Sequence, residues 1–379
     1  MESDKRLHIE TLAIHGANST KEQAAVRNPI HVTTTFERNT DGSYPTDFVY
    51  SREDNPNRVA LEQLLTQLEG GATGLAFASG SAAALAVVHS LQSGSHIVAP
   101  QDMYYGTKQI FTDLYGRWGL TCSFVDMGNL ASVETAITDQ TELIWVETPS
   151  NPMLGISDLR GLCELGKRRS LSVLADNTWA TPISMQPISL GADVVLHSTT
   201  KYIGGHSDII GGALVFNANN EMAQRARMFQ KKGGAVPSPF DCWLLVRSAA
   251  TLPVRFNKQS QNALLVAEFL STQSAIETVL FPGLPSHPNY RYAKDQMNGF
   301  GAMLSVLVRG DQPQAMKLAA NLQLFTRATS LGGVESLVEH RASVEGPATT
   351  TPTNLLRFSI GLEHPDDLIA DLKQALEVL

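Results

Sequence analysis

A segment near the middle of the chain, residues 197–208, reads HSTTKYIGGHSD and holds one lysine among hydroxyls and glycines. Lys201 follows Ser198 and Thr200 and precedes two glycines, which let the backbone pass close to a ligand. A desolvated lysine amine forms an imine with an aldehyde, and the nearby hydroxyls bind an attached phosphate. This combination predicts a site for pyridoxal 5'-phosphate (PLP). The alternative is a solvated surface lysine, the commonest fate of this residue type.

Two charged residues have the types that carbanion chemistry requires. Asp176, in ADNTW at 175–179, is predicted to pair with a protonated pyridine nitrogen, which makes the ring an electron sink. The alternative is an aspartate that caps a turn at the end of a strand. Arg357 interrupts an apolar run, so we expect it to face an anion, either a substrate carboxylate or an internal one.

Two other motifs have residues that bind phosphate. FASGSAA at 77–83 turns from an apolar run into an alanine-rich helix, where free amides favour phosphate. Gly80 and Ser81 are the expected donors, although serine here is also an ordinary helix cap. Arg52, two residues after Tyr50, has a guanidinium that grips phosphate in a bidentate way. Its distance from the other motifs predicts that it serves a neighbouring subunit.

Two further side chains are expected to contact the ring. Tyr104, in DMYYGT at 102–107, is predicted to stack on the pyridine, and a core tyrosine is the alternative. Asn151 lies between the two prolines of ETPSNP at 147–152. These prolines are expected to stiffen the turn and to aim the Asn151 amide at the ring hydroxyl. The alternative there is an ordinary proline turn.

Most of these residues lie just after short apolar runs. Such runs, separated by helical stretches, are typical of a mostly parallel sheet covered on both faces. In open α/β sheets ligands bind beyond the carboxyl ends of the strands, so the candidates are expected to meet there. Seven runs are predicted as strands: Leu75–Ala78, His96–Ala99, Cys122–Val125, Leu143–Val146, Ser172–Ala175, Val194–His197 and Ala213–Phe216.

The length of 379 residues exceeds the roughly 250–300 at which single cores stop growing, so more than one unit is expected. We predict a polar, extended arm over 1–55, a PLP-binding α/β domain over 56–245 and a smaller α+β domain over 246–379. The third part is expected to hold a long helix over Asn257–Thr272, strands over Leu304–Val308 and Leu355–Ile360, and a closing helix over Pro365–Leu376.

Composition excludes several classes of function. The net charge of -8 and the absence of a long basic run argue against nucleic acid and anionic membranes. No apolar stretch approaches the roughly 20 residues that span a bilayer, and the charged first residues lack the apolar core of a signal peptide. The 3 cysteines are widely spaced, which favours a reducing cytoplasm. No metal-binding spacing is present, so no metal is expected.

Taken together, the motifs resemble the Cys/Met-metabolism PLP enzyme family, which includes cystathionine γ-synthases, cystathionine γ- and β-lyases, methionine γ-lyases and homoserine-ester sulfhydrylases. The resemblance extends from Thr11 to Glu363, with the motifs in order. It implies a fold-type I, aspartate aminotransferase-like subunit with a large seven-stranded sheet domain and a smaller α+β domain. It also implies a homotetramer built from dimers and an amino-acid substrate.

The resemblance implies roles for individual residues as well. Lys201, which carries the internal aldimine, and Tyr104, which stacks on the ring, are the implied catalytic residues. The phosphate is held by Gly80, Ser81, Ser198 and Thr200. Tyr50 and Arg52 of the neighbouring subunit complete this phosphate site across the dimer interface. Asp176 pairs with the ring nitrogen. Asn151, Ser330 and Arg357 anchor the substrate carboxylate or the ring oxygen.

The chain departs from the family pattern where the substrate is expected. Thr329 stands where γ-synthases and γ-lyases usually have a glutamate, and VEHRASVEG at 338–346 replaces a segment that usually carries Met-Thr-His. We therefore expect groups near Thr329 and His340-Arg341 to select the leaving group.

Three functions remain open from the sequence. The first is γ-elimination or γ-replacement on a γ-substituted amino acid, such as a homoserine ester, cystathionine or canavanine. The second is β-elimination of the cystathionine β-lyase type, which is ranked lower because β-lyases tend to carry an aromatic residue near Thr329. The third is a PLP fold that serves sensing or assembly without turnover.

Overall fold

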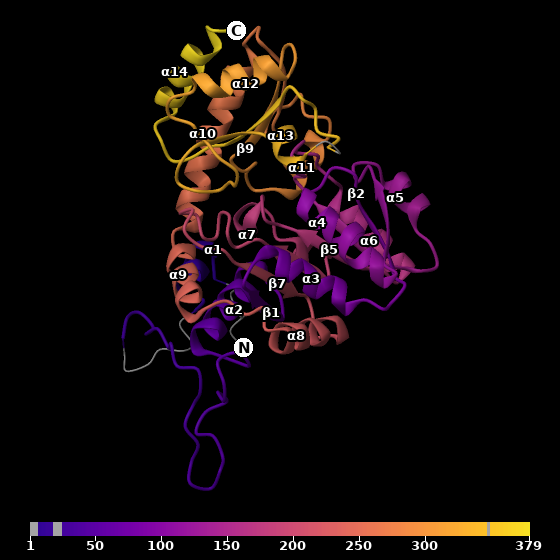
Figure 1. Cartoon of the computed structure of the whole chain (residues 1–379), viewed down its shortest axis with the longest axis vertical. Helices are drawn as coiled ribbons and strands as arrows, with labels where there is room; N and C mark the ends of the chain where they lie inside the picture. The colour runs from indigo at the N-terminus through magenta and orange to yellow at the C-terminus, as the bar shows by residue number, and fades with distance from the viewer. Residues whose placement is uncertain (1–6, 18–24, 347–348) are drawn as a thin grey trace.

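The computed structural model describes residues 7–17, 25–346 and 349–379. A seven-stranded sheet forms its middle, a five-stranded sheet lies above it, and a long loop within residues 25–55 projects below (Figure 1). The strands of the larger sheet are β1 (Thr73–Phe77), β2 (His96–Pro100), β3 (Thr121–Val125), β4 (Thr141–Glu147), β5 (Ser172–Asp176), β6 (Val194–His197) and β7 (Gly212–Phe216).

The larger sheet has the strand order β1-β7-β6-β5-β4-β2-β3. β7 runs antiparallel to both of its neighbours, and the other pairs are parallel. All seven predicted strands are therefore confirmed, as is the mostly parallel sheet. This arrangement gives the α/β class that the sequence predicts.

The strands are apolar along their length because both faces of the sheet are covered. In β4, Leu143 and Trp145 pack into a cluster with α3 (Gly80–Ser90) and α8 (Glu221–Gly233). Ile144 and Val146 point the other way and pack against α6 (Leu159–Arg169). Burial on both faces is what makes parallel strands read as continuous apolar runs.

The helix α2 (Pro56–Glu69) leads into this sheet. Asn55 caps it by accepting a hydrogen bond from the Asn57 amide, and Pro56 occupies the first turn, where no N–H is needed. The other short helical segments of this part are α4 (Tyr105–Gln109), a π-helical turn (Ile110–Tyr115), α5 (Leu130–Ala136), α7 (Thr181–Ser184), α9 (Pro239–Ala249), and 3₁₀ turns at Gly116–Trp118 and Pro187–Leu190.

The smaller sheet has the strand order β10-β11-β12-β9-β8. Two of its strands and the closing helix match the prediction, whereas the long helix α10 begins at Leu252 instead of Asn257. The elements are α10 (Leu252–Ser271), β8 (Ile276–Leu280), α11 (Tyr290–Gln296), β9 (Met303–Val308), α12 (Gln312–Asn321), β10 (Thr326–Arg327), β11 (Leu337–His340), α13 (Arg341–Glu345), β12 (Leu355–Ser359) and α14 (Pro365–Leu376).

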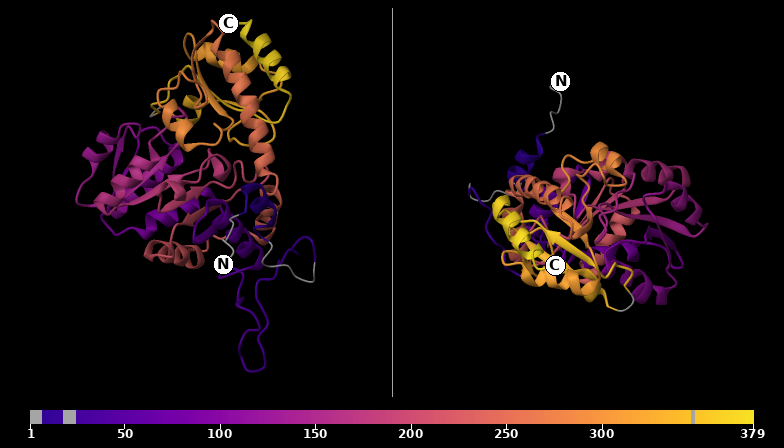
Figure 2. Two further views of the ribbon diagram at one scale, coloured as in Figure 1. Left: turned by 180° about the vertical axis from the view of Figure 1, so that it is seen from behind. Right: turned by 90° about the horizontal axis from the view of Figure 1, so that it is seen from above.

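The two sheets share one apolar core, and α10 runs from one to the other (Figure 2). Val195 of β6, Phe256 of α10 and Phe358 of β12 belong to the same buried cluster. The division into an arm and two domains stays a prediction, and its boundary after residue 245 falls within α9.

The expected extended arm contains one helix, α1 (Ile9–His15), in the described part. Leu12 and Ala13 are buried in the shared core beside Leu61 and Leu64 of α2. The helix forms because these neighbouring apolar residues find an apolar surface to cover.

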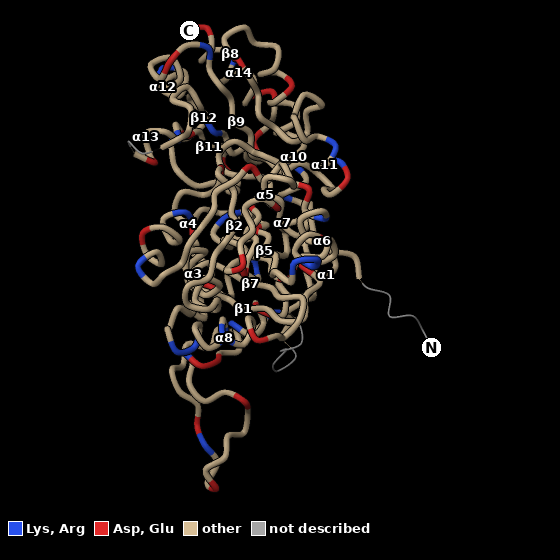
Figure 3. The backbone as a smooth tube through the Cα atoms, turned by 90° about the vertical axis from the view of Figure 1, so that its right-hand side faces the viewer, with Lys and Arg blue, Asp and Glu red and all other residues tan. Residues whose placement is uncertain are grey.

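The charges are dispersed along the backbone. Lys and Arg are interspersed with Asp and Glu in the view of Figure 3. Among the described residues, no helix is both long and apolar enough to cross a membrane.

Candidate functional site

A cavity of about 460 Å³ opens beyond the carboxyl ends of the large sheet and is bounded by segments of both sheets. It brings together the predicted site residues, apart from Tyr50 and Arg52. The predicted residues that line it are Gly80, Ser81, Tyr104, Asn151, Asp176, Ser198, Thr200, Lys201, Thr329, Ser330 and Arg357.

Lys201 lies in the turn after β6 and donates a hydrogen bond from Nζ to Ser330 Oγ at 2.9 Å. Burial, together with the positive charge of Arg357, lowers the pKa of Lys201 to about 8. The neutral amine, which can act as a nucleophile or a base, is therefore accessible near neutral pH. Ser330 adopts a left-handed backbone with φ +90°, which is rare outside glycine.

Asp176 ends β5, and its Oδ1 accepts hydrogen bonds from the Thr178 amide at 3.1 Å and the Thr178 hydroxyl at 2.5 Å. Its Oδ2 has no hydrogen bond within the described part of the chain. Burial raises the pKa of Asp176 because the carboxylate is poorly solvated. A pyridinium N–H would supply the missing partner, so this residue fits the ring nitrogen of PLP.

The start of α3 forms the part of the cavity where the sequence predicts phosphate binding. Ser79 caps this helix through the Ala82 amide, and Gly80 and Ser81 begin it. A side chain at Gly80 would place its Cβ 2.9 Å from Ser198 Cβ, so glycine leaves this corner open. The Thr200 hydroxyl is bonded to both backbone groups of Gly211. Free helix amides beside hydroxyls suit a phosphate.

Tyr104 lies on the wall of this cavity, just before α4. Its backbone N–H donates to Glu147 Oε2 at 2.9 Å, and its ring packs over Gly106, where a Cβ would lie 2.6 Å from the ring. Burial and the nearby charge of Asp176 hold the pKa of Glu147 well above its usual range. Glu147 was not assigned a role from sequence. An acidic residue directly after the apolar run 143–146 could have indicated that Glu147 lies at the edge of the sheet where the cavity forms.

Arg357, on β12, has an internal carboxylate as its partner and also lines the cavity. Its Nη1 donates to Asn151 Oδ1 at 2.8 Å, and its Nη2 donates to the Ser330 carbonyl at 3.1 Å and to Glu339. The internal carboxylate is thus Glu339, while Arg357 still lines the cavity. Because Asn151 uses its oxygen on Arg357, its contact with the ring hydroxyl stays a prediction.

Tyr50 and Arg52 lie outside the cavity of their own chain. Arg52 pairs with Glu53 at 3.2 Å and donates to the Lys231 carbonyl, and the Tyr50 side chain is exposed. Their contact with a neighbouring subunit stays a prediction.

The sequence pointed to His340-Arg341 as groups near the substrate, and only Arg341 of that pair lines the cavity. Glu345 and several other lining residues were not assigned from sequence because they come from segments without a clear motif. Arg341 and Glu345 line it from α13, whereas the neighbouring His340 points elsewhere and bonds to Ser343 and the Thr353 carbonyl. The others are Tyr105, Gly106, Thr107, Gln109, Leu196, Ile210, Leu331 and Val344, with Ser79, Glu147, Thr178 and Trp179 from the quoted motifs.

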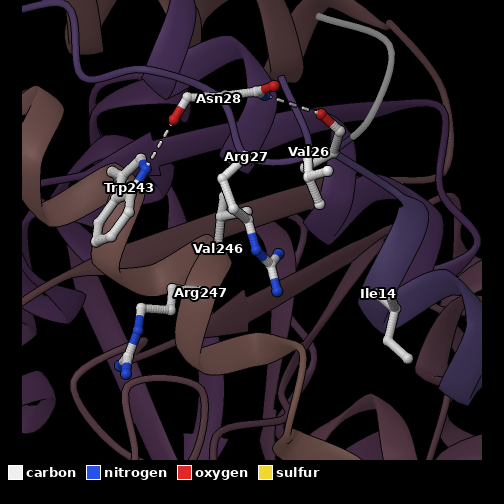
Figure 4. Close-up of a pocket in the computed structure, with 8 residues that line it drawn as sticks. Ile14, Val26, Arg27, Asn28, Trp243, Val246 and Arg247 are labelled. Atoms are coloured by element: carbon white, nitrogen blue, oxygen red, sulfur yellow. Dashed lines mark hydrogen bonds between the residues drawn. The ribbon is translucent and has the colours of Figure 1, made fainter. Parts of the chain in front are cut away.

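Metal binding and a second cavity are questions separate from the predicted PLP site. Within the described ranges, no group of three or more His, Cys, Asp or Glu side chains is placed to hold a metal. A separate cavity of about 160 Å³ lies beside α9 and includes Ile14, Arg27 and Arg247 in its lining (Figure 4). The Trp243 indole there donates to the Asn28 carbonyl at 2.9 Å.

Comparison with known proteins gives matches along almost the whole chain. The family model for Cys/Met metabolism PLP-dependent enzymes matches residues 10–377. A cystathionine gamma-synthase from Mycobacterium leprae is 45% identical, covering 99% of this chain and 100% of that protein. A cystathionine gamma-lyase from Dictyostelium discoideum is 40% identical, with 97% of each chain covered. The crystal structure of metB from Corynebacterium glutamicum has a TM-score of 0.96, 41% identity and 98% coverage of both chains.

Proposed function

Because the chain belongs to the family of Cys/Met-metabolism PLP-dependent enzymes, we propose that it catalyses γ-elimination or γ-replacement on a γ-substituted L-amino acid. One observation carries this proposal. Lys201, with a pKa lowered to about 8, is hydrogen-bonded to Ser330 in the same cavity as Asp176 and Arg357. A mobile base, an anion for the ring and a cation for the carboxylate are the groups that this chemistry requires.

PLP would be held by groups along one wall of the cavity. Gly80 and Ser81 at the start of α3, with Ser198 and Thr200, would take its phosphate, and Asp176 would pair with its ring nitrogen. When bound, PLP supplies a carbonyl that captures the substrate amine and a ring that withdraws electrons from the α-carbon. Asp176 favours that withdrawal because its carboxylate keeps the nitrogen protonated.

Lys201 moves the protons. Its Nζ removes the proton from the substrate α-carbon and would pass that proton on to the bound cofactor, which returns Nζ to the neutral amine. The same Nζ then removes a proton from the β-carbon, and the γ-substituent leaves with the electron pair of its bond to the γ-carbon. Ser330 holds Nζ at the rim of the cavity and limits the directions in which the amine can point. Burial keeps part of the amine neutral at the working pH, which is the form that accepts a proton.

Arg357 orients the substrate through its carboxylate. The guanidinium is fixed by Asn151, the Ser330 carbonyl and Glu339, so little side-chain freedom is lost when a substrate binds. Homoserine esters, cystathionine and related γ-heteroatom amino acids, canavanine included, are the substrate classes. Thr329, in the lining of the cavity, has no charge to offer a distal ammonium group.

The test is a screen of these amino acids with product identification by mass spectrometry, with and without cysteine. We expect 2-oxobutyrate or homoserine without cysteine, or a cysteine adduct with it. Pyruvate from cystathionine would instead assign the β-elimination found among its relatives, such as the cystathionine beta-lyase of Lactococcus lactis, which is 42% identical. No turnover of any amino acid would overturn the proposal and favour a sensing or assembly role.

The working enzyme is a homotetramer of two dimers, in which Tyr50 and Arg52 complete the phosphate site of the neighbouring subunit. Two observations support this assembly. The loop that precedes both residues projects from the body of the chain (Figure 2), and both residues lie outside their own cavity. The arginines that line that cavity, Arg341 and Arg357, lie on α13 and β12 and not near α3 in the sequence.

Subunit mixing tests the assembly. Lys201→Ala and Arg52→Ala chains are each expected to be nearly inactive. Refolded together, they should recover ~25% of wild-type activity, because half of random dimers hold one intact site out of two. A mixture of Lys201→Ala with Lys201→Ala/Arg52→Ala is the control. No recovery in the test mixture would place Arg52 in its own subunit.

A further inference from the structure

The short helix α13 places an ion pair on the wall of the cavity. Arg341 Nη2 donates to Glu345 Oε1 at 2.7 Å, and Nε donates to the same oxygen at 3.2 Å. Both side chains are almost fully buried, at 6% and 7% exposure, and both line the cavity. The pair belongs to the segment that departs from the family pattern.

Glu345 has no acceptor capacity left for a ligand. Its Oε1 takes the two bonds from Arg341, and its Oε2 takes bonds from Thr349 Oγ1 at 2.6 Å and Thr351 Oγ1 at 2.7 Å. A carboxylate offers about four acceptor positions, so these four bonds saturate it. The role of Glu345 is therefore to hold Arg341.

Arg341 still has donors to offer. A guanidinium carries five N–H groups, and in the described part of the chain three are used, two by Glu345 and one by Glu339 at 3.2 Å from Nη1. Each terminal nitrogen keeps one further N–H. Since Arg341 lines the cavity, this wall presents a rigid donor and no carboxylate oxygen to a ligand.

Glu339 fixes where this donor lies relative to the substrate. Its Oε2 accepts from both Arg357 and Arg341, so the two guanidinium groups lie on either side of one carboxylate oxygen. A substrate whose carboxylate is bound by Arg357 would therefore lie in the same part of the cavity as Arg341. Thr329, also in the lining, adds a hydroxyl and no charge.

We propose that Arg341 is a specificity-determining residue that selects γ-substituents carrying an acceptor oxygen, such as an acyl ester or carboxylate, over those without one. This inference rests on the proposed function, since it names the substrate class of the same site. An oxygen acceptor on the γ-substituent would accept a hydrogen bond from the remaining N–H groups of Arg341. An aliphatic group or a thioether would leave these N–H groups without a partner.

Binding to the PLP-loaded Lys201→Ala protein tests the inference without turnover. The probes are O-succinyl-L-homoserine, which has distal oxygens, and L-norleucine, which has none, with affinities from isothermal titration calorimetry. Replacing Arg341 by Met should weaken the ester about tenfold or more, as expected for a bond to a charged group, and change norleucine less than about twofold. Arg309→Met, on the exposed turn after β9, should change neither.

A second variant separates this role from a structural one. Arg341→Met/Glu345→Gln removes both charges, so no buried carboxylate is left unpaired, and it should show the same selective loss. Equal losses for the two probes would mean that Arg341 acts only on Arg357 through Glu339, and would overturn the inference. Equal affinity of the parent for both probes would also overturn it. The product screen, by contrast, judges the reaction itself in the wild-type protein.

Discussion

Lys201 Nζ and Ser330 Oγ lie 2.9 Å apart and join the turn after β6 to the segment before β11. The base and its hydrogen-bond partner thus lie on connections that belong to two different sheets, β6 to β7 and β10 to β11. The position of the amine consequently depends on how the two parts of the chain pack together. The left-handed backbone of Ser330 is part of the same contact.

Ser330→Ala should lower kcat by about 2- to 12-fold and change KM less, because one hydrogen bond to the base, worth ~0.5–1.5 kcal/mol, is lost. Steady-state kinetics measure both constants. Ser271→Ala, which removes a hydroxyl at the end of α10, is the matched control and should leave them unchanged. A rise in KM alone would show that Ser330 binds the substrate and does not position the base.

Lys201 should titrate below the other lysines in the cofactor-free protein. Its pKa is lowered to about 8, so the reactive neutral amine dominates above that pH, whereas exposed lysines need about pH 10.4. Competitive labelling with an amine reagent at a series of pH values, read by peptide mass spectrometry, gives each midpoint. A midpoint for Lys201 equal to that of an ordinary exposed lysine would contradict the expectation.

Asp176→Asn should reduce kcat by about 100-fold or more while the chain still folds. The amide can accept the hydrogen bonds of Thr178 but has no charge to keep a ring nitrogen protonated. Activity and bound-cofactor stoichiometry are measured together. Asp176→Glu, which keeps the charge, is expected to retain more activity than Asn, and the reverse order would refute the role given to the charge.

Asp102 should make stability depend on pH. Burial raises its pKa to about 6, so the folded chain loses stability as pH rises from about 4 to 6 and this carboxyl ionises. Asp102→Asn removes that charge and should raise the melting temperature more at pH 7 than at pH 4. Asp139→Asn, at an exposed position, is the control. The same shift at both pH values would rule out this assignment.

The large sheet was predictable because its strands are buried on both faces, which leaves continuous apolar runs such as 143–146. β11 was not predicted because a four-residue strand that contains Glu339 shows no such run. The start of α10 was placed too late, since Pro253 lies in its first turn, where proline is tolerated.

The candidate site could be assembled from sequence where residues follow parallel strands, as Asp176 and Lys201 do. The ends of such strands meet at one edge of a sheet, so order along the chain gives proximity. No such rule places Arg341 and Glu345, because they reach the cavity through the packing of one sheet on the other. Glu339 was hidden for the same reason.

The apolar core that links the two sheets also constrains how the protein melts. Phe256 and its neighbours are shared by both sheets, so neither sheet can lose its packing while the other keeps it. The chain should therefore lose both sheets in one transition, so that melting curves followed by far-UV circular dichroism and by tryptophan fluorescence coincide. A core variant such as Phe256→Ala would then disturb substrate affinity as well as melting temperature, although it lies outside the cavity lining.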